Sequence, residues 1–293
     1  MSDDAALAGI FTPQVVWRLQ SLDNKTKAQL TRVYVLTCGD GTGLGMMGPD
    51  LVTFRDAWAR YLACAFRVGL FDGANGNDLR ARLTGTDDDN FISAMNECLA
   101  TWFLADHLGL SVTPRPSGKS RSVLELAITL PDGQIFVEVK GLIRPITLDQ
   151  TNNDLNILVD ALDKANRQFA KGQRNLLVIV PRMLTFLFPS LTDVVSELLV
   201  SVFIGTRAVN DGPAGAAVRE TFRPTGAFLK ARPGNRVWFT TTGGVLVLNE
   251  HVQAPRMLYS ARLLHNPKAK VGLPTTIWGN VPQFTGASQG ARE

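Results

Sequence analysis

The sequence predicts an α/β fold, with a central mixed β-sheet flanked by helices and preceded by a mostly helical N-terminal part. Three observations support this class. Across residues 90–181 the elements read helix, strand, hairpin, helix, strand, which is the order of an α/β layer. The run NLLVIVP is nearly continuous in apolar residues, as expected for a strand covered on both faces. Residues 1–85 instead carry apolar side chains at helical spacing.

The N-terminal part is expected to contain a long amphipathic helix. In FRDAWARYLACAFRVGLF the large apolar residues recur every three or four positions and so form one helical face. They are Phe54, Trp58, Tyr61, Leu62 and Phe66. The next stretch, DGANGNDLRARLTGTDDDN, mixes glycine, asparagine and aspartate, which predicts a boundary before the following part.

The middle part is expected to begin with a helix and to continue through a hairpin into a second helix. The first helix is predicted from the apolar stripe Phe91, Met95, Leu99, Trp102 and Phe103. Gly109 is placed to end it. A short extended piece, SVTPRP, then leads into the hairpin, and the second helix is predicted from about Asn153 to Lys171.

The last third is expected to add a helix and further strands to the same sheet. LTDVVSELLVSVFIG predicts a helix, VWFTTTGGVLVLNE a strand or hairpin, and PRMLYSARLLHNP one more strand. No Gly/Ser linker sets this part off from the rest. We therefore expect a mostly helical region over residues 1–85, an α/β core over 86–185 and a basic C-terminal region over 186–293.

Composition and patterning exclude several classes of protein. With 45% hydrophobic and 19% charged residues, the 293-residue chain resembles a globular protein with enough apolar residues for a sizeable core. The start MSDDAALAGIFTPQ has two acids and no basic segment before an apolar one, unlike a secretory signal. The most apolar stretches are interrupted by Pro181, Arg182 and Glu197 before they reach the roughly 20 residues of a membrane helix, so no membrane span is predicted.

The cysteines and histidines do not predict a disulfide framework or a zinc site. Cys38, Cys64 and Cys98 are widely spaced and form no CxxC pair. The three histidines are too scattered for a local zinc motif. We therefore expect a cytoplasmic protein in a reducing compartment.

Positive charge is concentrated in the C-terminal third. Residues 205–293 hold eleven lysines or arginines and four acids, whereas residues 1–204 hold nineteen and twenty-two. A basic face suits a polyanionic partner, but a solvated surface explains the same charge. Within TFRPTGAFLKARPGNRVWF, basic and aromatic residues alternate as in a nucleic-acid groove. Here too an apolar core with solvated charges is an equal alternative.

The segment ELAITLPDGQIFVEVKG places three charged residues where core strands usually have none. If Asp132 and Gly133 form a two-residue turn, or residues 131–134 a four-residue loop, Glu125 faces Lys140 across the hairpin and Ala127 faces Glu138. Because side chains alternate with period two, Glu125, Glu138 and Lys140 then project from one face.

An exposed hairpin with a cross-strand ion pair is the alternative, and such a pair contributes about 0.2–1 kcal/mol. Against it, the same face carries the apolar residues Val123, Ala127 and Phe136. Glu97 in the preceding helix lies beside apolar positions. Gln168 in the following helix continues a predicted packing stripe formed by Leu158, Ala161, Leu162 and Ala165. These features favour a functional site.

The chemistry predicted for this site is metal-assisted phosphoryl hydrolysis. Two carboxylates, Glu125 and Glu138, with the backbone carbonyl of Val139 and water, are oxygen ligands that suit Mg²⁺ or Mn²⁺. A cation held there polarises a phosphodiester and lowers the pKa of water, while the ammonium of Lys140 stabilises developing negative charge.

These residues resemble the restriction-endonuclease-like PD-(D/E)xK superfamily of nucleases. In that group an acid on one central strand is followed by an acid, any residue and a lysine on the next strand. Glu125 stands where the first acid would be, although Asp is more usual there. Glu138-Val139-Lys140 looks like the second element, followed by Gly141.

The flanking helices resemble the same superfamily. Glu97 in NECLATWFL is similar to the helical acid that several branches place before the hairpin. Lys164 and Gln168 in ALDKANRQF look like the basic and glutamine positions of the next helix, and NLLVIV like the next core strand. The resemblance covers residues 90–181, about a third of the chain.

The resemblance implies a catalytic core of the restriction-endonuclease type that cleaves nucleic acid, most often DNA, with Mg²⁺ or Mn²⁺. Glu125 and Glu138 would be metal ligands, and Lys140 would lie near the attacking water. A homodimer fits this reading, because cutting two strands needs two sites.

Two alternatives remain at this point. One is a nucleic-acid-binding or scaffold protein that keeps the nuclease fold without catalysis, with the charged hairpin face as an ion-pair network. The other is an oxidoreductase, because GLGMMG fits the GxGxxG dinucleotide pattern. CGDGT separates that motif from the preceding apolar run, and Pro49-Asp50 interrupts the helix that should follow, which favours a glycine-rich loop.

Overall fold

The structure, a computed structural model, divides into two units. It describes residues 1–38, 48–114, 124–142, 161–181, 207–210, 219–222, 231–232, 236–237 and 239–284. Unit 1 comprises Met1–Pro116, Glu125–Thr129 and Glu250–Tyr259. Unit 2 comprises Ser117–Leu124, Leu130–Asn249 and Ser260–Glu293.

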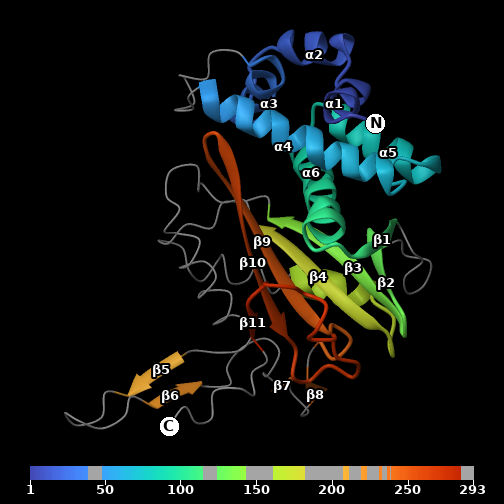
Figure 1. Ribbon diagram of the computed structural model, residues 1–293, viewed down its shortest axis with the longest axis vertical. Helices are drawn as coiled ribbons and strands as arrows, with labels where there is room; N and C mark the ends of the chain where they lie inside the picture. The colour runs from blue at the N-terminus through green and yellow to red at the C-terminus, as the bar shows by residue number, and fades with distance from the viewer. Residues whose placement is uncertain are drawn as a thin grey trace. The chain divides into compact units, whose positions relative to one another are not determined.

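Helices dominate the described part of unit 1 (Figure 1). They are α1 (Asp3–Ile10), α2 (Pro13–Gln20), α3 (Lys27–Thr37), α4 (Gly48–Arg67), α5 (Gly73–Thr84) and α6 (Asp88–Trp102). A π-helical turn, η2 (Phe103–His107), continues α6, and Gly109 follows it with a positive φ of 68°. Helix α4 packs against α1, α3 and α6, and α5 packs against α6.

Local sequence signals explain where these helices begin. Thr26 and Gln29 form a reciprocal capping box at the start of α3. Asp87 caps α6 by accepting a hydrogen bond from the backbone N–H of Asn90 at 2.8 Å. The apolar stripe predicted for residues 54–66 lies in α4, where Phe54, Trp58, Tyr61 and Leu62 are buried. Among the described residues, the helices are too short or too polar to cross a membrane.

The strands form a mixed sheet, so the predicted mixed α/β class is confirmed. The strands are β1 (Ser111–Pro114), β2 (Leu126–Leu130), β3 (Gly133–Leu142), β4 (Arg174–Pro181), β9 (Gly244–Gln253), β10 (Arg256–His265) and β11 (Gln283–Phe284). Among the described residues these seven follow the order β1-β2-β3-β4-β9-β10-β11. The β1·β2 pair is antiparallel, and the β3·β4, β4·β9 and β10·β11 pairs are parallel.

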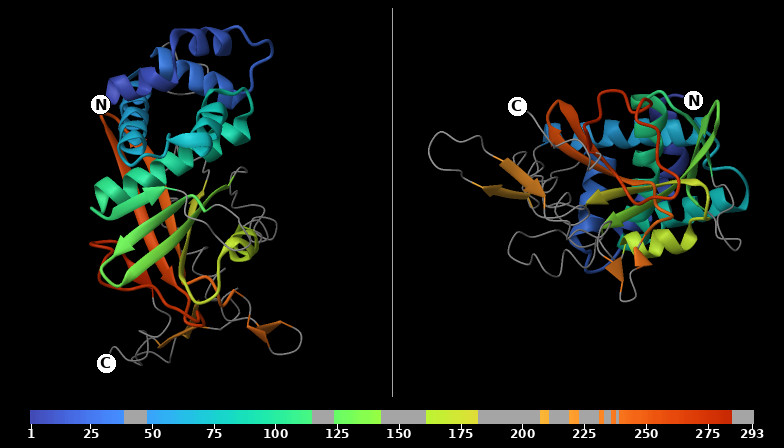
Figure 2. Two further views of the ribbon diagram at one scale, coloured as in Figure 1. Left: turned by 90° about the vertical axis from the view of Figure 1, so that its right-hand side faces the viewer. Right: turned by 90° about the horizontal axis from the view of Figure 1, so that it is seen from below.

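Unit 2 is built on parallel strands. Figure 2 shows β3, β4 and β9 side by side, with the helical residues 161–168 next to them. Residues Leu176, Leu177, Val178 and Ile179 of β4 are fully buried, as expected for a strand covered on both faces. Two short ladders also belong to this unit: β5 (Arg207–Asn210) with β6 (Arg219–Phe222), and β7 (Ala231–Arg232) with β8 (Arg236–Val237).

The predicted hairpin turn is wrong by one residue. Strand β2 ends at Leu130 and β3 begins at Gly133, so Pro131 and Asp132 connect them instead of Asp132 and Gly133. Proline presets the φ value of the second turn position, and aspartate is a common turn residue. Gly133 then takes a positive φ of 140°. The strand pairing predicted for the hairpin was therefore based on the wrong turn residues.

Two further differences concern helices. Residues 73–84, which the sequence pattern assigns to a boundary, form helix α5. The helix predicted to end near Lys171 ends at Gln168. The predicted start of that helix lies outside the described residues. The same holds for the helix expected over LTDVVSELLVSVFIG, for Val123, for residues 43–47 of GLGMMG and for most of TFRPTGAFLKARPGNRVWF.

Candidate functional site

Strand β3 carries the acid and the lysine of the predicted site. Glu138 and Lys140 are two residues apart, so both side chains project from the same face of the strand. Val137 and Val139 alternate with them and are buried. In the parallel register, Glu138 lies beside Leu177 of β4 and Lys140 beside Ile179, so the charged pair is bordered by an apolar strand.

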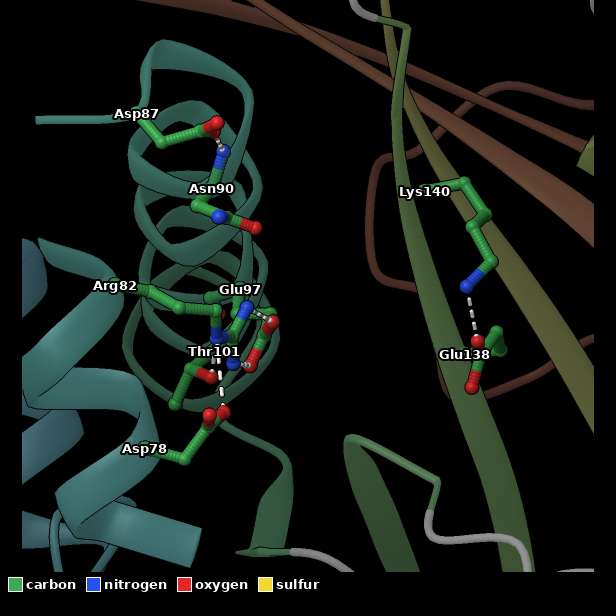
Figure 3. A network of polar contacts seen from close by, with 8 residues as sticks. All are labelled: Asp78, Arg82, Asp87, Asn90, Glu97, Thr101, Glu138 and Lys140. Atoms are coloured by element: carbon green, nitrogen blue, oxygen red, sulfur yellow. Dashed lines mark hydrogen bonds and ion pairs between the residues drawn. The ribbon is translucent and has the colours of Figure 1, made fainter. Parts of the chain in front are cut away.

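Glu138 and Lys140 form a direct ion pair (Figure 3). The ammonium of Lys140 donates a hydrogen bond to Glu138 Oε1. Glu138 is completely buried, whereas the Lys140 side chain is 27% exposed. A buried carboxylate needs compensation, because moving an ionised group out of water is costly. Lys140 supplies that compensation from the side nearer to solvent.

The second oxygen of the same carboxylate is uncompensated. Glu138 Oε2 is buried and has no hydrogen-bond partner among the described residues. Buried polar atoms are normally satisfied, and an exception calls for an explanation such as a bound ion or water. Glu138 therefore presents one oxygen that is suited to accept a cation or a hydrogen-bond donor.

The predicted helix residues of unit 2 lie in the segment that precedes β4. Lys164 and Gln168 belong to the helical residues 161–168, where Lys164 is exposed and Gln168 is half-buried. Ala161, Leu162, Ala165 and Phe169 form the buried side of this segment. The predicted packing stripe of this segment is thus confirmed at Ala161, Leu162 and Ala165.

Glu97, the acid predicted in the preceding helix, forms a different ion pair in unit 1. It is 3% exposed, and its two oxygens accept hydrogen bonds from Arg82 of α5 at 2.6 and 3.2 Å. Arg82 Nε also donates to Asp78 at 2.9 Å, so the guanidinium lies between two carboxylates (Figure 3). This network joins α5 to α6.

The electrostatics of Arg82 show how tightly the pair is held. Burial lowers the pKa of the guanidinium, but the hydrogen bonds and charge of Glu97, with a contribution from Asp78, outweigh burial and raise it. The bidentate geometry is the arrangement in which arginine and carboxylate interact most strongly. Glu97 is thus paired through both of its carboxylate oxygens.

Replacing Glu97 with glutamine is expected to destabilise the protein by about 3 kcal/mol, because it leaves a largely buried arginine without its main counter-charge. Urea unfolding followed by circular dichroism measures the change. Asp4→Asn is the control, because Asp4 forms an ion pair with Arg55 and its side chain is 79% exposed. Exposed ion pairs contribute about 0–1 kcal/mol. Wild-type stability in Glu97→Gln, together with lost activity, would assign Glu97 to the site instead of the helix junction.

Glu125, the predicted first acid of the hairpin, lies in unit 1. It is the residue immediately before β2 and is half-buried. Leu124 and Leu126 on either side of it are fully buried. Ala127 is fully buried as well, so burial does not alternate along β2, and the strand begins one position after Glu125.

The residues present can be compared with what a divalent cation requires. Among the described residues, His, Cys, Asp and Glu form no group of three or more that could hold a metal ion. Mg²⁺ does not require such a cage, because it usually keeps several waters and binds one or two carboxylates plus substrate phosphate oxygens. The unpartnered oxygen of Glu138 fits this mode of Mg²⁺ binding. The described residues do not provide a closed site of the kind that holds zinc.

Two polar networks in unit 1 were not found by sequence reasoning. Arg82 was missed as the partner of Glu97, although its spacing from Asp78 is the i,i+4 spacing of a helical ion pair. Tyr61 donates a hydrogen bond to Glu250 Oε2 at 2.6 Å, and its hydroxyl lies 2.7 Å from that of Tyr259. The sequence carries no local signal for this second network, because its members are 189 and 198 residues from Tyr61.

The fold and these side chains define a mixed α/β protein with a buried glutamate–lysine pair on a parallel strand. No protein-family model matches the chain, and no curated protein matches its sequence. Among solved structures, SfsA from Pyrococcus furiosus in complex with Ca²⁺ matches at 13% identity with a TM-score of 0.21. The match covers 57% of this chain and 59% of that chain, and such a score is too low to establish a common fold.

Proposed function

We propose that this protein is a metal-dependent nuclease that hydrolyses phosphodiester bonds in nucleic acid, with DNA as the expected substrate. The observation that carries the proposal is the Glu138 carboxylate: it is fully buried, bound to Lys140 through one oxygen and unpartnered at the other among the described residues. The resemblance of Glu138-Val139-Lys140 to the PD-(D/E)xK motif supports the same reading, and the basic C-terminal third suits a polyanionic substrate.

Glu138 would hold Mg²⁺ or Mn²⁺ through Oε2, with the Val139 carbonyl and Glu125 as the further ligands predicted from the sequence. A cation bound there would polarise the phosphodiester and lower the pKa of a water. Lys140, partly exposed beside the carboxylate, would donate hydrogen bonds to the negative charge that develops on the phosphate oxygens. The Leu177 and Ile179 side of the pair keeps it in an apolar setting, where such interactions are stronger.

A catalytically inactive nucleic-acid-binding or scaffold protein is the second candidate. The observation that favours it is the same ion pair, because Lys140 already neutralises the charge of Glu138. In that case the two residues serve the fold, and nucleic acid binds elsewhere without being cut. Salt-sensitive binding without hydrolysis distinguishes this candidate.

A cleavage assay tests the proposal. Wild type is expected to cut at least one of supercoiled plasmid, linear duplex, single-stranded DNA and RNA in Mg²⁺ or Mn²⁺, and none of them in EDTA. Lys140→Ala is expected to lower the rate on the order of 100-fold, as removal of one group that stabilises transition-state charge does. Glu125→Gln is expected to lower it through weaker metal binding.

Arg174→Gln is the matched control for these variants, because Arg174 is a basic residue on the neighbouring strand β4, and its partner Asp132 is largely exposed. Its cleavage rate should equal that of the wild type. Metal-dependent cutting that persists in Lys140→Ala would contradict the proposed site. Binding to DNA with no cleavage in any metal would favour the second candidate.

A further inference from the structure

The end of the β9–β10 hairpin is attached to the helices of unit 1 by a partly buried cluster of hydroxyl and carboxyl groups. Residues Glu250–Tyr259, the end of the hairpin, belong to unit 1. Glu250 of β9 and Tyr259 of β10 both meet Tyr61 of α4, through the 2.6 Å and 2.7 Å contacts of its hydroxyl. Tyr61 is 1% exposed, whereas Glu250 and Tyr259 are half-buried, so these bonds are partly shielded from water.

Aromatic rings enclose the cluster. Trp102, the last residue of α6, lies with its ring centroid 4.6 Å from that of Tyr259 and 5.3 Å from that of Tyr61. His107 of η2 lies 6.3 Å from Tyr259 and 5.8 Å from Trp102. These short centroid distances leave no room for a ligand between the rings, so the cluster is a packed junction and not a binding cage.

We propose that this junction is pH-sensitive: the hairpin end docks firmly on α4 and α6 when Glu250 is neutral and is held more loosely when Glu250 is ionised. Each tyrosine hydroxyl has one hydrogen. When Tyr61 donates its hydrogen to Glu250, Tyr259 donates to Tyr61, so the chain of hydrogen bonds ends on the carboxyl group. A negative charge on Glu250 would lie beside aromatic rings in a partly buried position.

The balance of interactions on Glu250 supports this direction. Burial raises the pKa of Glu250 from 4.5 to about 6, and the hydrogen bond from Tyr61 lowers it by less. Burial also raises the pKa of Tyr61 well above its usual value and that of Tyr259 to about 12, so both phenols stay protonated in the physiological range. Glu250 is therefore the member of the hydrogen-bonded trio that changes charge near neutral pH.

The other charged groups around the cluster do not reverse this effect. Arg60 of α4 acts on Tyr259, where its charge lowers the pKa by less than burial raises it. His251 follows Glu250 on β9, and its Nδ1 is buried without a partner among the described residues. His107 and His251 both lie next to members of the cluster, so both require control variants.

The sign of the pH effect follows from linkage. Because the pKa of Glu250 is higher in the docked state, docking is favoured below pH 4.5 and is weakened as the pH rises through about 6. The raised pKa of Glu250 corresponds to a decrease in the equilibrium constant for docking on the order of tenfold when the carboxyl group ionises. This figure allows for the partial exposure of Glu250.

Hydrogen exchange of the full-length protein tests the proposal. Amide protection of residues 250–259 is measured by mass spectrometry between pH 4.5 and pH 8, with rates normalised to those of the unfolded chain. In wild type, protection should fall on the order of tenfold with a midpoint near pH 6. Glu250→Gln, which imitates the neutral carboxyl, should stay protected throughout. His107→Gln and His251→Gln should behave like wild type.

Two results would overturn the proposal. One is a wild-type hairpin whose normalised protection does not change with pH. The other is a pH dependence that survives in Glu250→Gln and disappears in a histidine variant. If Glu250→Gln does not fold, a carbon-13 NMR titration of the glutamate carboxyl groups in wild type tests the proposal instead. If every glutamate carboxyl group titrates near pH 4.5, the raised pKa of Glu250 is contradicted.

Discussion

The double variant Glu138→Leu/Lys140→Met is expected to lose all metal-dependent cleavage and yet to unfold at a urea concentration no lower than that of wild type. Buried ion pairs are weak contributors to stability, because the cost of removing two charges from water offsets their attraction. Apolar residues of similar size beside Leu177 and Ile179 would continue the apolar surroundings of the site. A site kept for catalysis, not for stability, predicts this combination of results.

The single variant Lys140→Met separates the two roles further. It leaves Glu138 buried without its counter-charge, which should destabilise the protein by about 3 kcal/mol. If Glu138 also binds a cation, millimolar Mg²⁺ should restore part of this loss, because a ligand at 100 times its Kd stabilises the folded state by about 2.7 kcal/mol. Thermal unfolding with Mg²⁺ and with EDTA measures the effect without reference to activity.

The exposed pair in the same unit provides the control. Asp132 accepts two hydrogen bonds from Arg174, at 2.8 and 2.6 Å, but its side chain is 66% exposed. The double variant Asp132→Asn/Arg174→Gln should keep full cleavage and unfold at nearly the same urea concentration as wild type, because exposed ion pairs contribute little to stability. If the Glu138→Leu/Lys140→Met protein still cut nucleic acid, the assignment of the site would be wrong. If it were several kcal/mol less stable and insensitive to Mg²⁺, the pair would serve the fold.

Local periodicity is enough to predict the elements that surround this site. The run at 175–181 lies in β4, where its five consecutive apolar residues are covered on both faces, and the apolar stripe at 91–103 lies mostly in α6. The pairing of Glu138 with Lys140 also follows from local sequence, since residues two apart on a strand share a face. The hairpin turn is predicted one residue late when the Asp-Gly signal is given more weight than the proline before it.

Long-range partners are not predictable in the same way. Glu97 stands out for its unusual position beside apolar residues, but nothing near it in sequence indicates that Arg82 approaches from α5 with bidentate geometry. The Tyr61–Glu250–Tyr259 cluster joins residues that only the tertiary fold brings together. Burial and pairing of these carboxyl groups are properties of packing, and single-sequence patterns carry almost no information on them.

The glycines of the stretch 72–90 are among the residues that predict a boundary, whereas one of them, Gly76, permits a close helix–turn contact. Gly76 lies in α5 where the chain folds back on the preceding turn. A Cβ atom there would lie 2.1 Å from the carbonyl carbon of Phe71 and 2.2 Å from its oxygen. Both are backbone atoms, so a side-chain rotation cannot relieve the overlap. Glycine is thus required at position 76 because the α5 backbone lies close to the backbone of Phe71.

Gly76→Ala is therefore expected to destabilise the protein by about 3–5 kcal/mol, although alanine is by itself the better helix former by about 1 kcal/mol. To accept the methyl group, α5 must move away from Phe71, whose ring packs 4.4 Å from Phe66 and 4.9 Å from the Arg80 guanidinium. The same movement would disturb the Arg82–Glu97 pair that joins α5 to α6. Urea unfolding measures the loss of stability.

Gly48→Ala is the matched control, because Gly48, like Gly76, lies near the start of a helix and has no positive φ, but has nothing within 4 Å of the position that an alanine methyl group would take. That variant should be as stable as wild type or slightly more stable, through the helix preference of alanine. Equal stability of Gly76→Ala and Gly48→Ala would show that α5 does not approach Phe71 this closely. A large loss confined to Gly76→Ala would instead establish that the helix junction around Glu97 depends on a glycine in the stretch that the sequence pattern assigns to a boundary.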